Sequence, residues 1–448
     1  MTFDPRSQAL EILLRVERGG YADRSLDEAL RGHPAIDPRD RGLCTELVYG
    51  VLRWRGRLDF ALARFCKQPL SRLENRVLQL LRLGAYQILC LDRVPDAAAV
   101  DTSVRLARRL GLERATGFIN GVLRAMVRGQ QQVEWPAPDR QPLAYLQHEL
   151  SLPEWLAKRW HNELDHESFD LARALLEPAP FTLRTNTLKI SRTDLLNALE
   201  NSGHQAEPTG FAPEGIVITR RGPAALPGDS EGLYQVQDEA SMLIGHLVAP
   251  RPGERIVDCC AAPGGKTTHL AALADNRAEI VAVDLHPHRL ALIGQGAKRL
   301  GCQGITAKCW DMSRLPDFLS EASFDAVLVD APCSGLGVLR RNPEARWRLQ
   351  PGDIIDLSQR QLAILDHASR LVRPGGRLVY SVCTTTTEET TEIVDQFLSR
   401  NVQFFRRSFA DKVPASWQQI LDSQGALRSF PHRHKIDGFF AVSLTRKG

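Results

Sequence analysis

Two cysteines follow apolar runs that are typical of buried β-strands. Cys333 stands in DAPCSG, directly after FDAVLV, and Cys383 ends the run GRLVYSVC. The reactive form of a cysteine is the thiolate, which a cationic neighbour favours. We therefore interpret the pair as a reaction centre, with Lys266 or the arginines of LRRNPEARWR (339–348) as neighbouring cations. The alternative is that both thiols are small apolar residues of a core.

Three aspartates and a glycine-rich turn mark the same end of the predicted strands. The segment DCCAAPGGKTTHLA (258–271) predicts a strand, a turn and a helix start, where Gly264 and Gly265 let the backbone approach a ligand. It matches neither the dinucleotide fingerprint nor the P-loop. Acids ending the next three strands suit a ligand with ribose hydroxyls, an amino group and a cationic centre. S-adenosylmethionine has all three, so we predict it as the cofactor. The acids are Asp284, Asp311 and Asp330.

A thiolate, an acid and a methyl donor together suit methylation of carbon 5 of a pyrimidine. Carbon 5 is too poor a nucleophile to attack a sulfonium methyl unaided. Addition of a thiolate at carbon 6, with an acid at N3, turns carbon 5 into an enamine-like nucleophile, and a base later removes the carbon 5 proton as the thiol leaves. On the residues alone, either Cys333 or Cys383 can attack, with Asp330 as the acid. The target base must be unstacked, because carbon 6 is attacked from the ring face.

Hydrophobic periodicity predicts the elements that position these residues. Residues 1–128 carry apolar side chains at three- and four-residue spacing, which predicts an all-α domain. The Gln- and Pro-rich residues 129–142 are typical of a linker, and residues 143–235 predict a small α+β domain. From 236 to 448, strands alternate with helices, which predicts a Rossmann-type α/β domain with a parallel sheet covered on both faces.

Composition and charge favour a soluble protein that binds a polyanion. The chain has 448 residues, no apolar run near the roughly 20 residues of a membrane span, and no signal-like start, so we expect a cytoplasmic protein. Residues 51–130 hold fourteen arginines and one lysine against six acids, which favours RNA or DNA over membrane. Arg53, Arg55 and Arg57 are candidate phosphate contacts, although arginines on solvated helix faces would give the same pattern. The nine cysteines form no CxxC pair, so we expect no metal site.

The quoted motifs together resemble a known family. DCCAAPGGKT, DAPCSG, RRNPEARWR and YSVCT, with LRTNTLK, QDEASML and DGFFAVSL, resemble the bacterial RNA 5-methylcytosine methyltransferases. The helical segments DRGLCTELVYGVLRWRGRLD and GFINGVLR resemble the NusB-type RNA-binding domain fused to the RsmB (Fmu/Sun) branch. This resemblance implies methylation of cytosine 967 of 16S ribosomal RNA, as naked or early assembly RNA, by a monomer. It also implies that the small α+β domain is RNA-recognition-like.

The resemblance assigns a role to each candidate residue. Cys383 is implied as the nucleophile, and Cys333 as the residue that assists release of the methylated base, although Val382 stands where members usually have threonine. The implied cofactor-binding residues are Cys260, Ala261, Ala262, Pro263, Gly264, Gly265, Lys266, Asp284, Asp311 and Asp330. Two rival functions stay open, a transfer RNA methylase and a non-enzymatic RNA-binding factor. The combination of Asp330 with both cysteines argues against the second.

Overall fold

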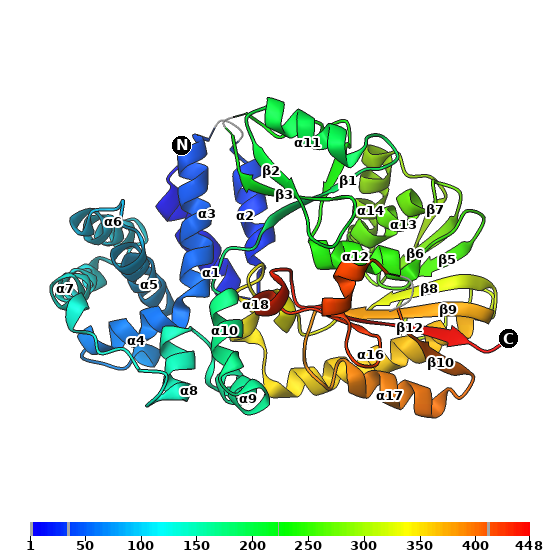
Figure 1. Ribbon diagram of the computed structural model, residues 1–448. Helices are drawn as coiled ribbons and strands as arrows, with labels where there is room; N and C mark the ends of the chain where they lie inside the picture. The colour runs from blue at the N-terminus through cyan, green and yellow to red at the C-terminus, as the bar shows by residue number, and fades with distance from the viewer. Residues whose placement is uncertain (1–2, 34–35, 223, 410–412) are drawn as a thin grey trace. The chain divides into compact units, whose positions relative to one another are not determined.

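The structure is a computed structural model that describes residues 3–33, 36–222, 224–409 and 413–448 (Figure 1). The chain divides into two compact units. We call the first the helical unit, which comprises residues 1–178 and 339–349. We call the second the sheet unit, which comprises residues 179–338 and 350–448.

The apolar faces of the predicted helices form one core in the helical unit. Helix α5 packs against α1, α3, α4, α6 and α7, and even its polar Gln79 and Arg82 are buried. Asp4 and Asp37 cap α1 and α3 by accepting hydrogen bonds from backbone amides, which explains where these helices begin. The helices are α1 (Pro5–Glu17), α2 (Ala22–Arg31), α3 (Pro38–Arg53), α4 (Arg55–Phe65), α5 (Asn75–Cys90), α6 (Asp96–Arg109) and α7 (Glu113–Gly129).

The helical unit continues beyond the predicted linker. A short 3-10 turn, Gln130–Gln132, lies in that segment, and a single π-helical turn, Tyr145–Glu149, follows it. Leu156 and Trp160 bury the apolar face of the next long helix. The helices here are α8 (Pro142–Ala144), α9 (Glu154–Leu164) and α10 (Glu167–Ala174).

The arginine-rich segment 339–349 belongs to the helical unit, although the sequence on either side belongs to the sheet unit. Arg346, in the short helix α15 (Ala345–Arg348), is fully buried and donates hydrogen bonds to the carbonyls of Ser151 and Leu175. Trp347 donates to the carbonyl of Leu52. The expectation that this segment supplies cations to the thiols is therefore wrong for Arg346, whose guanidinium satisfies buried carbonyls instead.

The small predicted α+β region forms an antiparallel sheet in the order β2-β3-β1-β4. Leu183, Leu195 and Ile216 are among its buried core residues. Ser191 caps the helix as the sequence predicts, by accepting a hydrogen bond from the amide of Asp194. The elements are β1 (Phe181–Thr185), α11 (Arg192–Asn201), β2 (Gln205–Pro208), β3 (Gly215–Arg220) and β4 (Tyr234–Val236).

The large sheet is mixed, with the order β10-β12-β9-β8-β5-β6-β7 and β11 paired to β12. Strands β5 to β9 run parallel, as predicted, but β10, β11 and β12 pair antiparallel. The expectation of a purely parallel sheet is therefore wrong for β12, which runs opposite to β9 and pairs antiparallel with β9, β10 and β11. The strands are β5 (Arg255–Asp258), β6 (Glu279–Asp284), β7 (Ile305–Cys309), β8 (Phe324–Asp330), β9 (Val372–Val382), β10 (Phe404–Arg407), β11 (Leu427–Arg428) and β12 (Phe440–Arg446).

Helices cover both faces of the large sheet, as the continuous apolar strands predict (Figure 1). Within β8, Val327 and Val329 belong to one hydrophobic cluster, whereas Ala326 and Leu328 belong to another. The helices are α12 (Glu239–Val248), α13 (Gly265–Leu273), α14 (Pro287–Leu300), α16 (Pro351–Leu371) and α17 (Thr391–Arg400), with the single turn α18 (Pro431–His434) near the end. Among the described residues, none of the helices combines the length and apolar character that a membrane span requires.

Candidate active site

The two thiols lie side by side at one edge of the large sheet. Strands β8 and β9 are parallel neighbours, with Asp330 opposite Ser381, so the residues that follow them meet. The Sγ atoms of Cys333 and Cys383 are 3.3 Å apart. The hydrogen bond with Cys383 and, next to it, burial raise the pKa of Cys333 well above its ordinary value. The Cys333 thiol therefore stays protonated near neutral pH.

A half-buried ion pair lies next to the thiols. Nζ of Lys266 lies 2.7 Å from Oδ2 of Asp330, and the hydroxyl of Ser381 donates to Oδ1 of Asp330 at 2.8 Å. Burial alone would lower the pKa of Lys266, but Asp330 and Cys383 outweigh it and raise that pKa. Lys266 therefore carries a positive charge, and it is the cation that the sequence analysis placed near the thiols.

The predicted acids and cysteines line one cavity of about 290 Å³ in the sheet unit. Asp284 and Asp330 end β6 and β8, and Asp311 follows β7, so strand order brings all three to this cavity. Cys333 and Cys383 line it as well. Its apolar wall includes Leu285, Met312 and Ile364.

Hydrogen bonds hold the glycine-rich turn against Asp284. The amides of Ala262 and His286 donate to its two carboxylate oxygens at 3.1 and 3.0 Å, and Arg289 donates to the carbonyl of Ala262 at 2.6 Å. Gly264 has φ of +101°, and a Cβ there would lie 3.0 Å from Cα of Ile293. Only glycine fits this position without strain. The turn is therefore preorganised for close approach by a ligand.

Asp311 is ionised at the same edge. A hydrogen bond from the backbone of Ser313 lowers the pKa of its carboxyl and outweighs the smaller effect of burial. The acid thus offers a negative charge to the cavity, in line with the prediction of a ligand that carries a positive centre.

Sequence reasoning missed Glu389, which joins the two cysteine loops. This side chain is fully buried. It accepts hydrogen bonds from the amide and hydroxyl of Ser334 at 2.8 and 2.5 Å, from Gln361 at 2.9 Å, and from Thr386 at 2.9 Å. The hydroxyls of Ser334 and Thr384 lie 2.8 Å apart. The only signal in the sequence was an acid a few residues after Cys383, which by itself indicates a helix start.

The predicted phosphate contacts in the helical unit are buried or paired. Arg53 is buried, and Arg55 pairs with Glu17 at 2.9 Å. Arg57 pairs with Glu149 and lies over the ring of Trp135. The prediction that these three arginines contact RNA is therefore not supported, because Arg53 is buried and the other two pair with acids of the unit.

A parallel sheet with a glycine-rich first turn and acids at successive strand ends defines a nucleotide-binding α/β domain of the methyltransferase class. Family models match along the whole chain: NusB family over residues 4–128, the ferredoxin-like domain of RsmF/B-like methyltransferases over 152–225, and 16S rRNA methyltransferase RsmB/F over 245–445. The small antiparallel sheet is thus the ferredoxin-like part of that architecture.

Curated relatives agree with the family models. The chain is 35% identical over 448 residues, and 99% of each protein, to the probable ribosomal RNA small subunit methyltransferase B of Bacillus subtilis (strain 168). It is 34% identical over 415 residues, and 92% of each protein, to ribosomal RNA small subunit methyltransferase B of Salmonella paratyphi B. The chain belongs to the RsmB/F family of S-adenosylmethionine-dependent 16S ribosomal RNA methyltransferases, with a NusB domain at its N-terminal end.

Solved structures share the fold. The crystal structure of PH0851 covers 99% of both chains at 27% identity, with a TM-score of 0.83. A methyltransferase homologue from Pyrococcus horikoshii covers 69% of this chain and 100% of its own, at 29% identity and a TM-score of 0.59. These matches confirm the predicted fold class and the family that the motifs resembled.

Proposed function

We propose that this protein methylates carbon 5 of a cytosine in 16S ribosomal RNA, through a covalent bond between Cys383 and carbon 6 of the base. The observation that carries the proposal is the pair of thiols at adjacent strand ends, with Sγ atoms 3.3 Å apart. Methylation of an amino group or a ribose hydroxyl needs no thiol, whereas carbon 5 needs a nucleophile at carbon 6 to activate it. The motifs that resemble the RsmB branch make cytosine 967 the proposed target.

The first half of the reaction forms the covalent intermediate. The Cys383 thiolate, stabilised by the ammonium of Lys266, adds to carbon 6 of the unstacked base. The displaced electron pair reaches N3, which takes up a proton from the Lys266–Asp330 pair, and carbon 5 becomes the nucleophilic end of an enamine. S-adenosylmethionine, when bound, supplies the methyl group that carbon 5 accepts. Asp330 holds the base in this position through its N3 edge.

The second half releases the product. A base removes the carbon 5 proton, the bond between Cys383 and carbon 6 breaks, and the proton on N3 returns to the Lys266–Asp330 pair as the ring double bonds re-form. Cys333 is the proposed base. Its raised pKa depends first on the hydrogen bond with Cys383. Bond formation at Cys383 removes that hydrogen bond, while burial still raises the pKa, so in this proposal the Cys333 thiol passes its own proton to solvent in the open cavity and then accepts the carbon 5 proton.

The cofactor is assigned to the cavity beside the glycine-rich turn. Residues 260–266 would approach it with backbone groups, Asp284 would accept hydrogen bonds from ribose hydroxyls, and Asp311 would face the amino or cationic groups. Supporting this, the amides of Ala262 and His286 each take only one acceptor site of the Asp284 carboxylate, so each oxygen has a lone pair to spare. The apolar wall of the cavity suits an adenine ring.

The assignment of Asp284 is tested by calorimetry. Asp284→Ala removes charge-assisted hydrogen bonds to the cofactor, each worth on the order of 1.5–3 kcal/mol, so cofactor affinity should fall at least about tenfold. Asp284→Asn keeps the shape and shows whether the charge is needed. RNA affinity should not change in either variant. Native cofactor affinity in Asp284→Ala would refute the ribose assignment.

The activity is tested with purified protein, labelled S-adenosylmethionine and deproteinised 16S ribosomal RNA. We expect labelled 5-methylcytosine in the RNA, mapped to cytosine 967, with a single chain as the active species. Label in transfer RNA but not in 16S RNA would instead favour the rival methylase. Absence of transfer to deproteinised RNA, early assembly particles and transfer RNA would favour a non-enzymatic RNA-binding role.

A further inference from the structure

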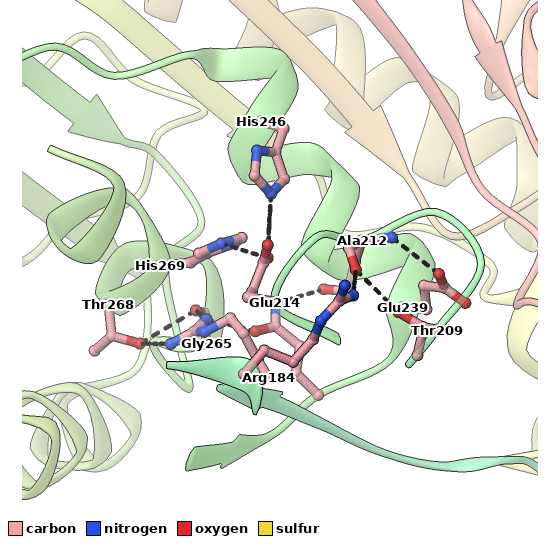
Figure 2. Close-up of polar contacts among 12 residues, drawn as sticks. Arg184, Thr209, Ala212, Glu214, Glu239, His246, Gly265, Thr268 and His269 are labelled. Carbon is pink, nitrogen blue, oxygen red and sulfur yellow. Dashed lines mark hydrogen bonds and ion pairs between the residues drawn. The ribbon is translucent and has the colours of Figure 1, made fainter. Parts of the chain in front are cut away.

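A cluster of two histidines and a glutamate, residue types that ligate metals, lies outside the candidate active site in the sheet unit (Figure 2). Nε2 of His246 lies 2.9 Å from Oε2 of Glu214, and Nε2 of His269 lies 2.8 Å from Oε1. One ligand atom from each residue falls within 4.8 Å of the others. The three residues come from the loop before β3, from α12 and from α13. Their convergence therefore depends on tertiary structure and not on a local sequence motif.

The buried imidazole of His269 is poorly satisfied. Its side chain is 2% exposed, and that of Glu214 is 6% exposed. Nε2 of His269 faces the carboxylate but forms no aligned hydrogen bond, and Nδ1 has no hydrogen-bond partner among the described residues. His246, in contrast, forms hydrogen bonds with the carboxylate. A buried polar nitrogen without a hydrogen-bond partner costs free energy, so the unpartnered Nδ1 beside this cluster calls for an explanation.

The protonation states suit a metal ion. Burial and the nearby positive charge of Arg184 lower the pKa of His269 to about 4, so the ring is neutral near pH 7. Burial raises the pKa of Glu214, but the two imidazoles beside its carboxylate outweigh burial and hold that pKa well below its usual range. An ionised carboxylate and a neutral imidazole are the forms that coordinate metals.

We propose that Glu214, His246 and His269 bind one Zn²⁺ ion through a carboxylate oxygen and two Nε2 atoms. Two imidazoles and one carboxylate are a donor set that zinc accepts, with a water molecule in the fourth position. Ca²⁺ and Mg²⁺ prefer oxygen ligands alone. Arg184 opposes any cation here, so affinity must come from coordinate bonds to nitrogen and not from net charge, which again favours zinc.

The surroundings of the proposed zinc site indicate how the ion enters and what role it has. The side chain of His246 is 25% exposed, which gives an ion a path from solvent. The helix that carries His269 begins at the glycine-rich turn, and Glu214 belongs to the ferredoxin-like part. The ion would therefore link the ferredoxin-like part to α13, the helix that begins at the glycine-rich turn of the candidate cofactor site. We assign it a structural role, separate from methyl transfer.

The full-length protein tests the proposal by direct metal measurement. Protein stripped with a chelator and dialysed is titrated with Zn²⁺ in competition with a chromogenic chelator, and its melting temperature is recorded with and without the metal. We expect one zinc per chain and a higher melting temperature with zinc. His246→Gln should lower the zinc affinity by more than about tenfold. His166→Gln, which removes an exposed histidine of the helical unit, is the matched control and should bind as the wild type does.

Three outcomes would overturn the assignment. Wild-type protein that takes no zinc from the competitor, with an unchanged melting temperature, would show that the cluster is a hydrogen-bonded triad without an ion. His246→Gln that retains wild-type affinity would place any bound zinc elsewhere, and equal losses in His246→Gln and His166→Gln would indicate surface binding. The wild-type competition needs no variant, so misfolding of a substituted protein cannot obscure it.

Discussion

At the scale of the residue, the hydrogen bond between the thiols gives them different roles. If Cys383 attacks, Cys383→Ala should lose both methyl transfer and the covalent protein–RNA adduct. Cys333→Ala should still attack and methylate but eliminate slowly, so an adduct that survives detergent should accumulate on a denaturing gel. Asp330→Ala should stop the reaction before the adduct forms. An adduct trapped by Cys383→Ala and absent from Cys333→Ala would reverse the two assignments.

Asp258, at the end of β5, makes the stability of the sheet unit depend on pH. It is completely buried, and its carboxylate accepts a hydrogen bond from the hydroxyl of Thr267 at 2.7 Å. Burial raises its pKa from 3.8 to about 7. A raised folded-state pKa means that the stabilising contribution of the protonated acid is complete below the unfolded pKa. It is lost as pH rises through the folded value.

The corresponding prediction compares the wild type with Asp258→Asn. The amide cannot ionise but can still accept from Thr267. Between about pH 4 and about pH 7 the melting temperature of the wild type should therefore fall relative to that of the variant, with no further divergence above about pH 8. Thermal unfolding across this range measures the difference. Parallel curves for the two proteins would show that Asp258 does not titrate in this window.

At the scale of the element, strand β1 of the ferredoxin-like part holds the start of α13. Arg184 is buried and donates to the carbonyl of Gly265, to Oγ1 of Thr268 at 3.0 Å and to Gln237 at 2.5 Å (Figure 2). Gly265 lies in the glycine-rich turn. We infer that Arg184 is a positioning residue for the cofactor turn, because its guanidinium satisfies several groups at fixed geometry.

Arg184→Met should therefore weaken cofactor binding by about tenfold, the equivalent of one charged hydrogen bond, and should raise KM for the cofactor more than it lowers kcat. Arg184→Lys should restore part of the loss. Arg192→Met is the control, since Arg192 makes one long hydrogen bond at 3.4 Å on the neighbouring α11. A lower melting temperature of Arg184→Met with normal cofactor affinity would indicate a purely structural role.

The elements also show what the sequence could predict. The placement of strand-end residues such as Asp284, Asp330 and Cys383 at one edge of the sheet was predictable, because parallel strands have their carboxyl ends at the same edge however the helices pack. Residues that act through distant partners were not. Arg55 and Arg57 pair with acids 38 and 92 positions away, and the buried Arg346 bonds to carbonyls 195 and 171 positions away. Charge alone indicated a surface, and only tertiary structure shows that Arg55 and Arg57 are paired and that Arg346 is buried.

At the scale of the whole molecule, the candidate chemistry lies in the sheet unit, so the helical unit is free to contribute RNA affinity. A cavity of about 600 Å³ in this unit lies between α6 and α7. Arg108, Arg124 and Arg128 line it and are exposed. Within the described part of the chain, none of these three pairs with a carboxylate. Asp101, which also lines the cavity, pairs with Arg105.

We therefore expect the arginines that line this cavity to contact phosphates in place of Arg53, Arg55 and Arg57. The triple variant Arg108→Gln, Arg124→Gln and Arg128→Gln should bind 16S RNA more weakly at low salt. Each lost phosphate contact removes about 0.7–0.9 from the slope of log affinity against log salt, so the slope should flatten by about 2. Cofactor affinity should stay at the wild-type value. The matched control replaces Arg18, Arg24 and Arg31, which are exposed on or next to α1 and α2. If both triple variants change the salt slope equally, the loss of net positive charge explains the effect, and the cavity between α6 and α7 has no special part in RNA binding.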